Sequence, residues 1–362
     1  MPNRVRRSCG AAQIRLAAAG LAALSAAAVA LPSHALTILP HYDASVTGLS
    51  NASAVKSAFN RVVADYAQSF TNPATINVNV SWGSVAGSAL PSSAVGASVD
   101  NLYGYFTYAQ VKSDLTTFSA ANPLDTALAK AVRSLPSTAP AGPSRYVVPS
   151  AEAKVLGLIS PTQSGADGSI GFAGSSLGYD FNPYDGVTAG RYDFEAVAAH
   201  ELAEVLGRLG GINSATPSWR TPLDLFRYSA PGVLDYGYND ATYFSIDGGV
   251  TRLKAFNNAG SGDRTDWASG TYDVSNAYIS TGHAYNLTAV DLTALDVLGY
   301  GGSNLGDTAS AYPTKTAFSL VQPGLGVPEP GQWMLLIAGF GLTGATLRRR
   351  RALRPQAVRA RR

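Results

Sequence analysis

The sequence predicts an α+β protein with a mixed or antiparallel sheet and a buried helix. Three observations lead to this fold class. Thr75–Trp82 alternates apolar and polar residues with the period of a half-buried strand. Ser50–Gln68 repeats apolar residues at the spacing of an amphipathic helix. Phe194–Leu206 is strongly apolar around a few charged residues, which is typical of a helix inside a domain.

The boundaries of the helix over 194–206 are also marked. Asp193 can accept hydrogen bonds at its start, and Gly207 stands where a left-handed glycine often ends a helix. The remaining predicted elements, in chain order, are a helix over Asp125–Leu135, a loop over 136–150, a strand over Ser169–Phe172, a β-hairpin of Tyr243–Ile246 and Val250–Phe256, and a final helix over Thr288–Leu298.

Residues 1–35 predict a secretory signal peptide. Arginines come first, the apolar run Leu16–Leu31 follows, and small residues precede a cleavage site after Ala35. Cleavage there removes Cys9, the only cysteine, so the exported protein has no disulfide. We expect signal peptidase to process the chain and the body, residues 36–301, to work outside the cytoplasm.

The C-terminal end predicts a second targeting signal. A flexible linker over 302–326 leads to a tail over 327–362, which contains Pro328-Glu329-Pro330, an apolar stretch over 333–347 and a cluster of arginines. At about 1.5 Å per residue the apolar stretch spans roughly 22 Å, short of a hydrocarbon core of ~30 Å. We therefore expect transient membrane contact through 333–347.

This three-part tail resembles the PEP-CTERM sorting signal of exopolysaccharide-producing Gram-negative bacteria. The resemblance implies that an exosortase-like membrane enzyme cuts near Pro328, Glu329 and Pro330. It also implies a final location in the cell envelope, at the cell surface or in the extracellular matrix. An ordinary tail anchor is the alternative interpretation.

The charge distribution argues against a nucleic-acid-binding function. Twelve of the 27 Lys and Arg residues lie in the two end segments, 1–35 and 348–362. Residues 36–327 keep 15 basic residues against 23 Asp and Glu, a net charge of about −8. Such an acidic body repels a phosphate backbone, and we expect no nucleic-acid partner.

The motif that carries chemistry is H-E-L-A-E, residues 200–204. Residues four apart share a helical face, so His200 and Glu204 can hold one ion with Glu201 beside them. In zinc hydrolases with an H-E-x-x-H helix, the glutamate at the second position activates water. Here a glutamate replaces the second histidine, which leaves a bound ion a weaker Lewis acid. A solvated acidic helix face is the alternative.

Three features favour the metal site over that alternative. The rest of the helix is apolar, so its charges need partners. Gly207 permits a sharp turn directly after the motif. Histidine is also scarce, because only His41, His200 and His283 remain after signal cleavage. His41 is expected at the surface.

A series of segments resembles one family of secreted bacterial metalloprotease-like proteins, whose helix reads H-E-x-x-E-x-x-G-R and which often carry a PEP-CTERM tail. The resemblance implies a metzincin-like zinc-peptidase fold, with His200 and Glu204 as Zn²⁺ ligands and Glu201 as general base. The matching segments are His200–Arg208, Thr221–Ser229, Tyr243–Gly249, Gly262–Trp267 and Asp291–Tyr300.

Two departures from ordinary metzincins stand out. The usual template has its third ligand where this chain has Gly210. A methionine turn is impossible, since Met1 and Met334 are the only methionines. The site is therefore built differently or is inactive.

The third ligand is predicted to be Asp224, in one of the matching segments, with His283 as the alternative. Asp224 can instead be a turn aspartate that binds its own backbone after Pro222. With two carboxylate ligands the charge of Zn²⁺ is neutralised, which makes another divalent cation conceivable.

Further residues receive supporting roles. Arg208, Arg227 and Tyr228 are candidates to stabilise an oxyanion or to hold the ligands. A structural Ca²⁺ site is conceivable at four aspartates in Gly/Asn-rich surroundings, although none follows a known calcium-loop pattern. These are Asp247, Asp263, Asp266 and Asp273.

The function predicted from these patterns is a secreted zinc-dependent metalloendopeptidase that hydrolyses protein or peptide substrates. Glu201 takes a proton from the attacking water and returns it to the leaving amine. The alternative is an inactive, protease-like protein that binds a surface or exopolysaccharide matrix. An acid/base pair of Glu201 and Glu204 acting on glycosides is disfavoured, because both stand on one helix without opposed faces.

Overall fold

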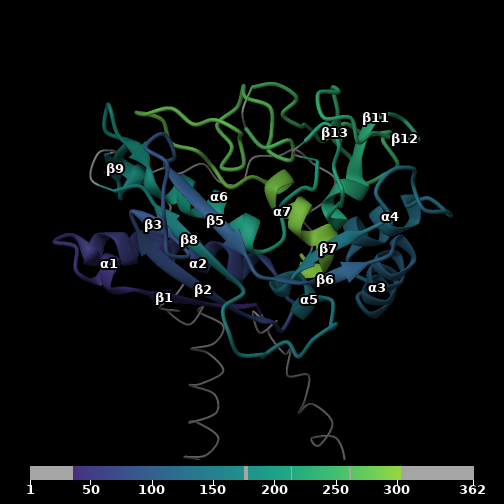
Figure 1. The fold of residues 1–362 in the computed structure, drawn as a ribbon, viewed down its shortest axis with the longest axis horizontal. Helices are drawn as coiled ribbons and strands as arrows, with labels where there is room; N and C mark the ends of the chain where they lie inside the picture. The colour runs from purple at the N-terminus through teal and green to yellow at the C-terminus, as the bar shows by residue number, and fades with distance from the viewer. Residues whose placement is uncertain (1–35, 175–177, 213, 261, 303–362) are drawn as a thin grey trace, which may run out of the picture. The chain divides into compact units, whose positions relative to one another are not determined.

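A four-stranded mixed sheet organises the fold (Figure 1). We describe a computed structural model, in which residues 36–174, 178–212, 214–260 and 262–302 are placed. These residues belong to one compact unit. The sheet order is β1 (Thr37–Tyr42), β2 (Thr75–Trp82), β8 (Gly168–Phe172) and β5 (Gly96–Asp100).

The strands of this sheet are parallel except at one edge. β1 and β8 both pair with β2 in parallel, whereas β5 is antiparallel to β8. Along β2 the apolar side chains of Ile76, Val78 and Val80 are buried, while the side chains between them face the opposite side. This confirms the strand predicted over 75–82 and shows that one sheet face covers the core.

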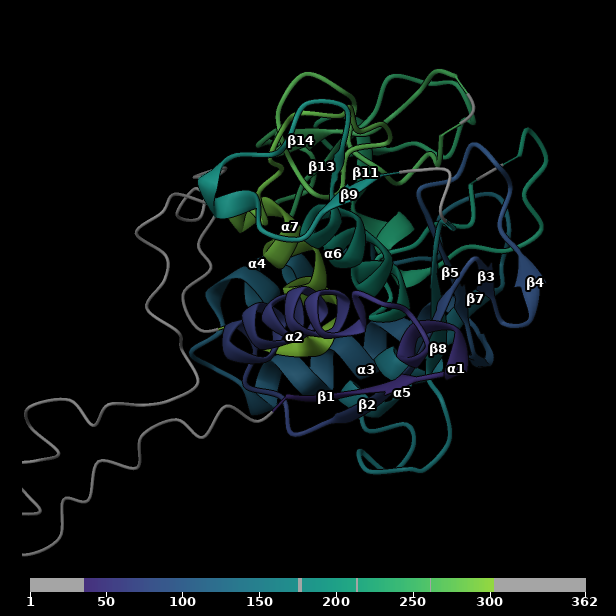
Figure 2. The same cartoon turned by 90° about the vertical axis from the view of Figure 1, so that its left-hand side faces the viewer.

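Two helices cover that face. α2 (Ala52–Ser69) and α6 (Phe194–Val205) pack together and against the sheet, with α6 next to β5 and β8. Figure 2 shows α2 with β1 and β2 below it and α6 above it. The Tyr66 hydroxyl of α2 donates to the Ala199 carbonyl of α6 at 2.9 Å, and Arg61 pairs with Glu195 at 2.7 Å. These contacts fix α6 on the sheet.

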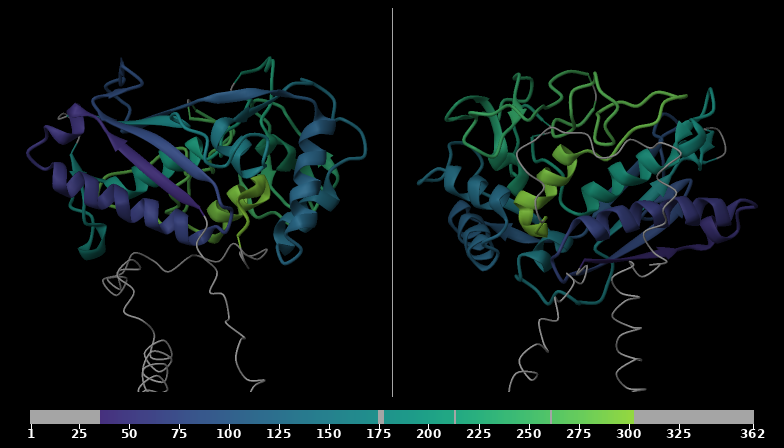
Figure 3. Two further views of the ribbon diagram at one scale, coloured as in Figure 1. Left: turned by 90° about the horizontal axis from the view of Figure 1, so that it is seen from below. Right: turned by 180° about the vertical axis from the view of Figure 1, so that it is seen from behind.

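The remaining elements surround this core, as the two views of Figure 3 show. The other helices are α1 (Ala44–Thr47), α3 (Tyr108–Ala121), α4 (Thr126–Ser134), α5 (Ser150–Val155) and α7 (Ala289–Leu295), which runs into a π-type turn over Asp296–Tyr300. Short 3₁₀ helices span Pro183–Asp185 and Pro222–Phe226. The other strands are β3 (Ser84–Val85), β4 (Ser88–Ala89), β6 (Leu102–Phe106), β7 (Tyr146–Pro149), β9 (Tyr179–Asp180), β10 (Tyr192–Asp193), β11 (Arg227–Ala230), β12 (Val233–Leu234), β13 (Tyr243–Phe244) and β14 (Lys254–Ala255).

The helices predicted from the sequence are confirmed, and so is the mixed α+β class. The predicted hairpin is present, but its strands β13 and β14 are shorter than expected because the Asp247 carboxylate accepts from the Thr251 amide and hydroxyl and turns the chain locally. The loop predicted over 136–150 was wrong at its end. β7 forms there because the backbone of residues 146–149 pairs antiparallel with β6 and its side chains are buried.

Several segments with predicted roles lie outside the described residues. They are the signal peptide over 1–35, most of the linker over 302–326, and the tail over 327–362 with Pro328, Glu329 and Pro330. Within the part of the chain that the structure describes, none of the helices is long and apolar enough to cross a membrane.

Glu152 of α5 makes a testable contribution to stability. Its side chain is fully buried, and neither carboxylate oxygen has a hydrogen-bond partner among the described residues. Burial raises the pKa of this carboxyl well above its usual range. The folded protein therefore keeps a proton that the unfolded chain releases above about pH 4.3. Because the folded state binds one proton more than the unfolded state, the free energy of unfolding of the wild type falls as the pH rises from about 4 toward neutral.

We expect Glu152→Gln to remove this pH-dependent loss. The free energy of unfolding of the variant, relative to the wild type, should grow by about 1–3 kcal/mol between pH 4 and pH 7. Urea unfolding of both proteins across this range measures the difference. A difference that stays constant with pH would show that Glu152 is ionised in the folded protein.

Candidate metal centre

Helix α6 supplies the first residues of the site, and its start is anchored on two sides. The Asp193 carboxylate accepts from the Ala196 amide at 3.1 Å as the predicted N-cap, and its other oxygen accepts from the Tyr285 amide at 3.0 Å. At the other end, Gly207 has φ +107° and reverses the chain. After the turn, the side chain of Arg208 lies against Asp266 and Trp267.

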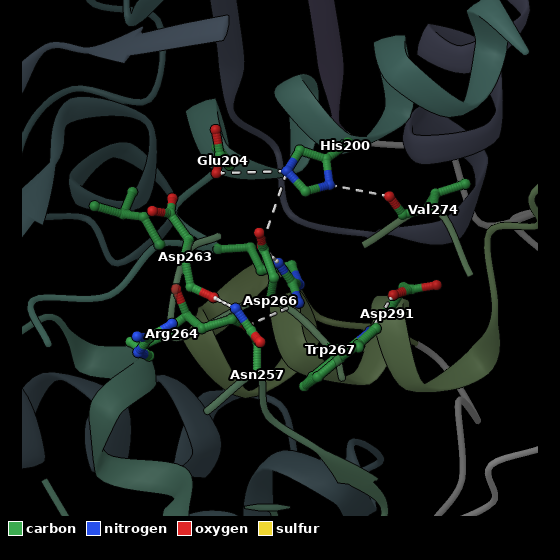
Figure 4. Close-up of polar contacts among 12 residues, drawn as sticks. His200, Glu204, Asn257, Asp263, Arg264, Asp266, Trp267, Val274 and Asp291 are labelled. Carbon is green, nitrogen blue, oxygen red and sulfur yellow. Dashed lines mark hydrogen bonds and ion pairs between the residues drawn. The ribbon is translucent and has the colours of Figure 1, made fainter. Parts of the chain in front are cut away.

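His200, Glu204 and Asp266 converge on one point (Figure 4). The Nε2 atom of His200 lies 3.7 Å from Oε1 of Glu204 and 3.8 Å from Oδ1 of Asp266. One ligand atom from each residue lies within 4.8 Å of the other two. Ligand atoms around a tetrahedral ion with bonds of about 2.1 Å lie about 3.4 Å apart, so the observed separations are close to a ligand set.

The imidazole of His200 is oriented by a backbone carbonyl. Its Nδ1 lies 3.0 Å from the carbonyl oxygen of Val274. Because a carbonyl only accepts, Nδ1 carries a proton and donates; when the imidazole is neutral, as a metal ligand must be, the lone pair is on Nε2 and faces the two carboxylates. A histidine prepared in this tautomer is typical of a metal ligand.

Asp266 is held by the buried side chain of Arg208. The guanidinium donates to Oδ1 of Asp266 at 3.2 Å and to the Thr265 carbonyl at 3.0 Å, and it stacks 4.4 Å from the Trp267 ring. The Trp267 indole in turn donates to Asp291 of α7 at 2.6 Å. This chain of contacts fixes the loop that carries Asp266 between α6 and α7.

Strand β5 runs along α6 and holds its carboxylates. The Ser98 hydroxyl donates to Oε2 of Glu204 at 2.6 Å. Two residues earlier on the same face, a Cβ atom at Gly96 would lie only 2.6 Å from Oε1 of Glu201. Glycine therefore provides the space that Glu201 occupies. Oε2 of Glu201 is buried and has no hydrogen-bond partner among the described residues.

A cleft of about 530 Å³ opens on this arrangement. Its lining includes His200 and Glu201 from α6, Gly96 at the start of β5 with Val95 before it, and Asp263 from the loop before Asp266. Apolar side chains, among them those of Val197, Val274 and Ile279, form much of the remaining wall. The cleft can therefore admit a ligand to Glu201 and His200, while Glu204 and Asp266 lie behind its lining.

The three converging residues place the His200 imidazole opposite the carboxyl groups of Glu204 and Asp266, so that a positive charge faces negative ones. Burial alone would lower the pKa of His200, but Asp266 and Glu204 outweigh it and raise that pKa well above its usual value. Burial opposes ionisation of Glu204, yet the charge of His200 at 3.7 Å and the hydrogen bond from Ser98 lower the pKa of Glu204. A cation is therefore favoured at this point, and in the absence of a metal the imidazolium fills that role.

The carboxyls around the ion pair are crowded. Burial, with the nearby Glu204, raises the pKa of Glu201 well above its usual range and that of Asp100 to about 8. Partial desolvation and the charges of Glu204 and Asp266 also raise the pKa of Asp263 to about 6, although its side chain is exposed at the rim of the cleft. A divalent cation among these groups would lower each of these pKa values.

The structure does not bring the predicted third ligand, Asp224, to this cluster. Asp224 lies in the 3₁₀ helix over 222–226, where its Oδ2 accepts from the backbone amides of Thr221 at 2.8 Å and Gly211 at 2.9 Å. It is thus the turn aspartate considered as the alternative. His283 also lies elsewhere, exposed and stacked 4.9 Å from the Tyr272 ring. The third member of the cluster with His200 and Glu204 is Asp266.

The supporting residues separate into two groups. Arg208 touches Asp266 directly, and buried Arg227 donates to the Arg264 carbonyl in the loop that carries Asp266. Tyr228 lies on β11, paired with Tyr243, and belongs neither to the cluster nor to the lining of the cleft. Its predicted role at an oxyanion therefore has no geometric support.

The aspartates considered for calcium do not gather. Asp247 accepts hydrogen bonds from Ser245 and Thr251, and Asp273 pairs with Lys254. No second group of three metal-ligating side chains converges within the described ranges. Asp266, named as a calcium candidate, is the member of this set that joins the His200 cluster.

The donor set fits a divalent cation. It combines one oriented imidazole nitrogen with two carboxylates, a set found with zinc and also suited to manganese. The fit rests on three observations: the convergence of the ligand atoms, the proton of His200 fixed on Nδ1, and an unpartnered buried oxygen of Glu201 beside them. These donors do not select one metal over another.

Comparison with known proteins adds no further constraint. The chain matches no protein-family model, no curated protein and no solved structure.

Proposed function

We propose that the protein is a metal-dependent hydrolase of peptide bonds. The observation that carries the proposal is the juxtaposition of the His200, Glu204 and Asp266 cluster with the buried carboxyl of Glu201 at an open cleft. Water activation by a metal needs a cation, a nearby base and room for the substrate. All three requirements are served by residues of α6 and the loop before Trp267.

Each residue has a distinct part in the proposed reaction. His200, Glu204 and Asp266 would hold the cation, and Arg208 positions Asp266. When bound, a divalent cation would polarise the scissile carbonyl and increase the acidity of water. Glu201 takes the proton from the attacking water and delivers it to the leaving amine, since its carboxyl follows His200 on α6 and lines the cleft with it.

The edge of the sheet supports a peptide as the substrate. β5 is the last strand in the sheet order, so one of its edges has no strand partner among the described residues. Gly96 of β5 borders both the cleft and Glu201. An extended peptide can add to such an edge through backbone hydrogen bonds. Its backbone would then run past Glu201 whatever its side chains are.

A metzincin-like zinc peptidase remains our proposal for the finer class. It is supported by the helix with His200 and Glu204 one turn apart and by a mixed sheet with an antiparallel edge strand. The chain departs from that class in its third ligand. It also lacks a methionine turn, and in this chain the carbonyl of Val274 contacts the imidazole of His200. We propose Zn²⁺ as the ion, with Mn²⁺ as the other candidate.

We further propose an exported protein. The signal-like residues 1–35 and the sorting-like tail 327–362 support processing by signal peptidase and an exosortase-like enzyme, with transient membrane contact. The substrate would then be a protein or peptide of the cell envelope or of the extracellular matrix.

Metal analysis combined with a protease assay tests the function. We expect the purified protein to contain about one equivalent of a divalent metal and to cleave casein. Because the cation activates the water, dialysis against a chelator should reduce cleavage to background, and added Zn²⁺ or Mn²⁺ should restore it. Metal without cleavage of any protein would favour the inactive binding protein, and absence of metal would contradict the proposed site.

A further inference from the structure

A second, larger groove lies at the far end of the strand that borders the cleft. It has a volume of about 680 Å³ and is formed by β6, the start of α3, and the segment that leads into β7. Aromatic and proline side chains make up much of its wall, including Tyr105, which is 62% exposed. An exposed aromatic ring in a groove of this size provides a contact surface for a ligand.

The groove is basic, in contrast to the acidic body of the protein. Its lining contains Lys112 and Arg145 and no Asp or Glu. The Arg145 guanidinium lies 5.7 Å from the centre of the Tyr105 ring, and the Lys112 ammonium is fixed by donating to the Pro136 carbonyl at 2.6 Å. Two cations held over an aromatic wall, without a neighbouring acid in the lining, are complementary to a carboxylate group.

One extended segment joins this groove to the cleft. β5 leads through Asn101 directly into β6, which pairs with β7 (Figure 1). The Asn101 amide donates to the Asp167 carbonyl at 2.9 Å, and its carbonyl accepts from the Ser150 amide at 2.7 Å. Asp167 directly precedes β8 and Ser150 directly follows β7. Because the amide and carbonyl of one residue in a strand point to the same side, β8 and β7 lie along the same edge of residues 96–106.

The opposite edge of residues 96–106 therefore has no strand partner in the described structure, from the cleft to the groove. Gly96 borders the cleft, and Tyr105 borders the groove. Nine steps along a regular strand correspond to about 30 Å, and β6 departs from regular pairing by a register shift between Leu102 and Gly104. A peptide added along this edge would reach the groove with a residue about nine positions from the bond at Glu201.

We infer that the groove over Tyr105, Lys112 and Arg145 is a second binding site for the substrate, which holds an acidic side chain of an extended peptide remote from the cleaved bond. This inference rests on the proposed function, because only that function makes the ligand of the groove a substrate. The groove itself can bind an acidic peptide whether or not the cleft catalyses hydrolysis.

Peptide binding tests the groove directly. The probe is a fluorescein-labelled (Glu-Tyr)₅ peptide, added to the full-length protein and followed by anisotropy. We expect binding that weakens with salt, at least about 10-fold weaker binding of (Lys-Tyr)₅, and at least about 10-fold weaker (Glu-Tyr)₅ binding after Arg145→Glu. Arg252→Glu is the matched control, since Arg252 is also exposed and stacks 4.5 Å from a tyrosine ring, yet lies outside the groove.

Equal weakening by the two arginine substitutions, or no preference for the acidic peptide, would overturn the inference. Binding of polygalacturonate without binding of (Glu-Tyr)₅ would overturn it too, because the ligand would then be an acidic polysaccharide. Tyr105→Ala provides a second variant at an exposed position, and it should weaken (Glu-Tyr)₅ binding at least about 5-fold.

Casein cleavage tests the link to the active site. Arg145→Glu should raise the KM for casein about 5-fold and leave kcat unchanged, while cleavage of a hexapeptide too short to reach the groove stays as in the wild type. If the hexapeptide is affected equally, the groove is not a separate site for the substrate. If the wild type cleaves no peptide at all, the proposed function fails, whereas the anisotropy experiment still decides on the groove.

Discussion

Glu201→Gln should lower kcat for casein by about 1,000-fold while the bound metal is retained. The substitution keeps the size of the side chain and removes the carboxylate that accepts the proton from water, and general bases typically contribute 100- to 10,000-fold. Because Glu201 is not a member of the ligand cluster, its loss should not release the ion. Steady-state kinetics and metal analysis on the same preparation measure both quantities.

Two outcomes would separate catalysis from structure in this variant. Loss of the metal together with activity would make Glu201 a ligand instead of a base. Activity within about 10-fold of the wild type would exclude it as the general base. Circular dichroism of both proteins provides the control for folding.

Asp266→Asn should weaken metal binding more than about 100-fold. It replaces a carboxylate of the cluster by a neutral amide, and even the loss of residues that only support metal ligands typically costs 10- to 100-fold in affinity. The matched substitution is Asp224→Asn, at the aspartate that the sequence favoured and the fold uses as a turn cap. Its metal affinity should stay within about 3-fold of the wild type. Competition titration with a fluorescent chelator measures both affinities.

The opposite pattern, in which Asp224→Asn releases the metal and Asp266→Asn does not, would contradict the assignment. The histidines offer a parallel comparison. His200→Ala should lose the metal, and His283→Ala, at an exposed position outside the cluster, should keep it.

The parts of the fold that the sequence revealed are those with local signals. β2 alternates its apolar residues, and α6 has an aspartate before its first turn and a glycine after its last. The pair of His200 and Glu204 was also local, because four residues make one helical turn. Each of these signals depends on residues within one element.

The parts that escaped prediction depend on contacts between distant segments. Asp266 is far from His200 in the chain, and its position is set by Arg208 and Trp267. The sequence marked the segment over 262–267 only through a family resemblance and through Asp263 and Asp266 as calcium candidates, and it did not connect Asp266 with His200. β5 escaped because the residues that face α6 are small: Gly96 leaves room for Glu201, and Ser98 binds Glu204. Such a strand has no apolar alternation to detect.

The sequence around Asp224 permitted two interpretations, a metal ligand and a turn aspartate. The proline before it already favoured a turn, and the carboxylate caps that turn by accepting from the Thr221 amide. Both backbone amides donate to Oδ2 of Asp224, and this carboxylate lies outside the cluster around His200. The structure brings Asp266, and not Asp224, next to His200.

A crystal structure of the metal-loaded protein, with diffraction data collected on both sides of the absorption edge of the metal, tests the central claim most directly. We predict one anomalous peak, with Nε2 of His200 and a carboxylate oxygen each of Glu204 and Asp266 within about 2.0–2.3 Å of it. A peak at another place in the protein, or no peak after loading with Zn²⁺ and Mn²⁺, would contradict the account.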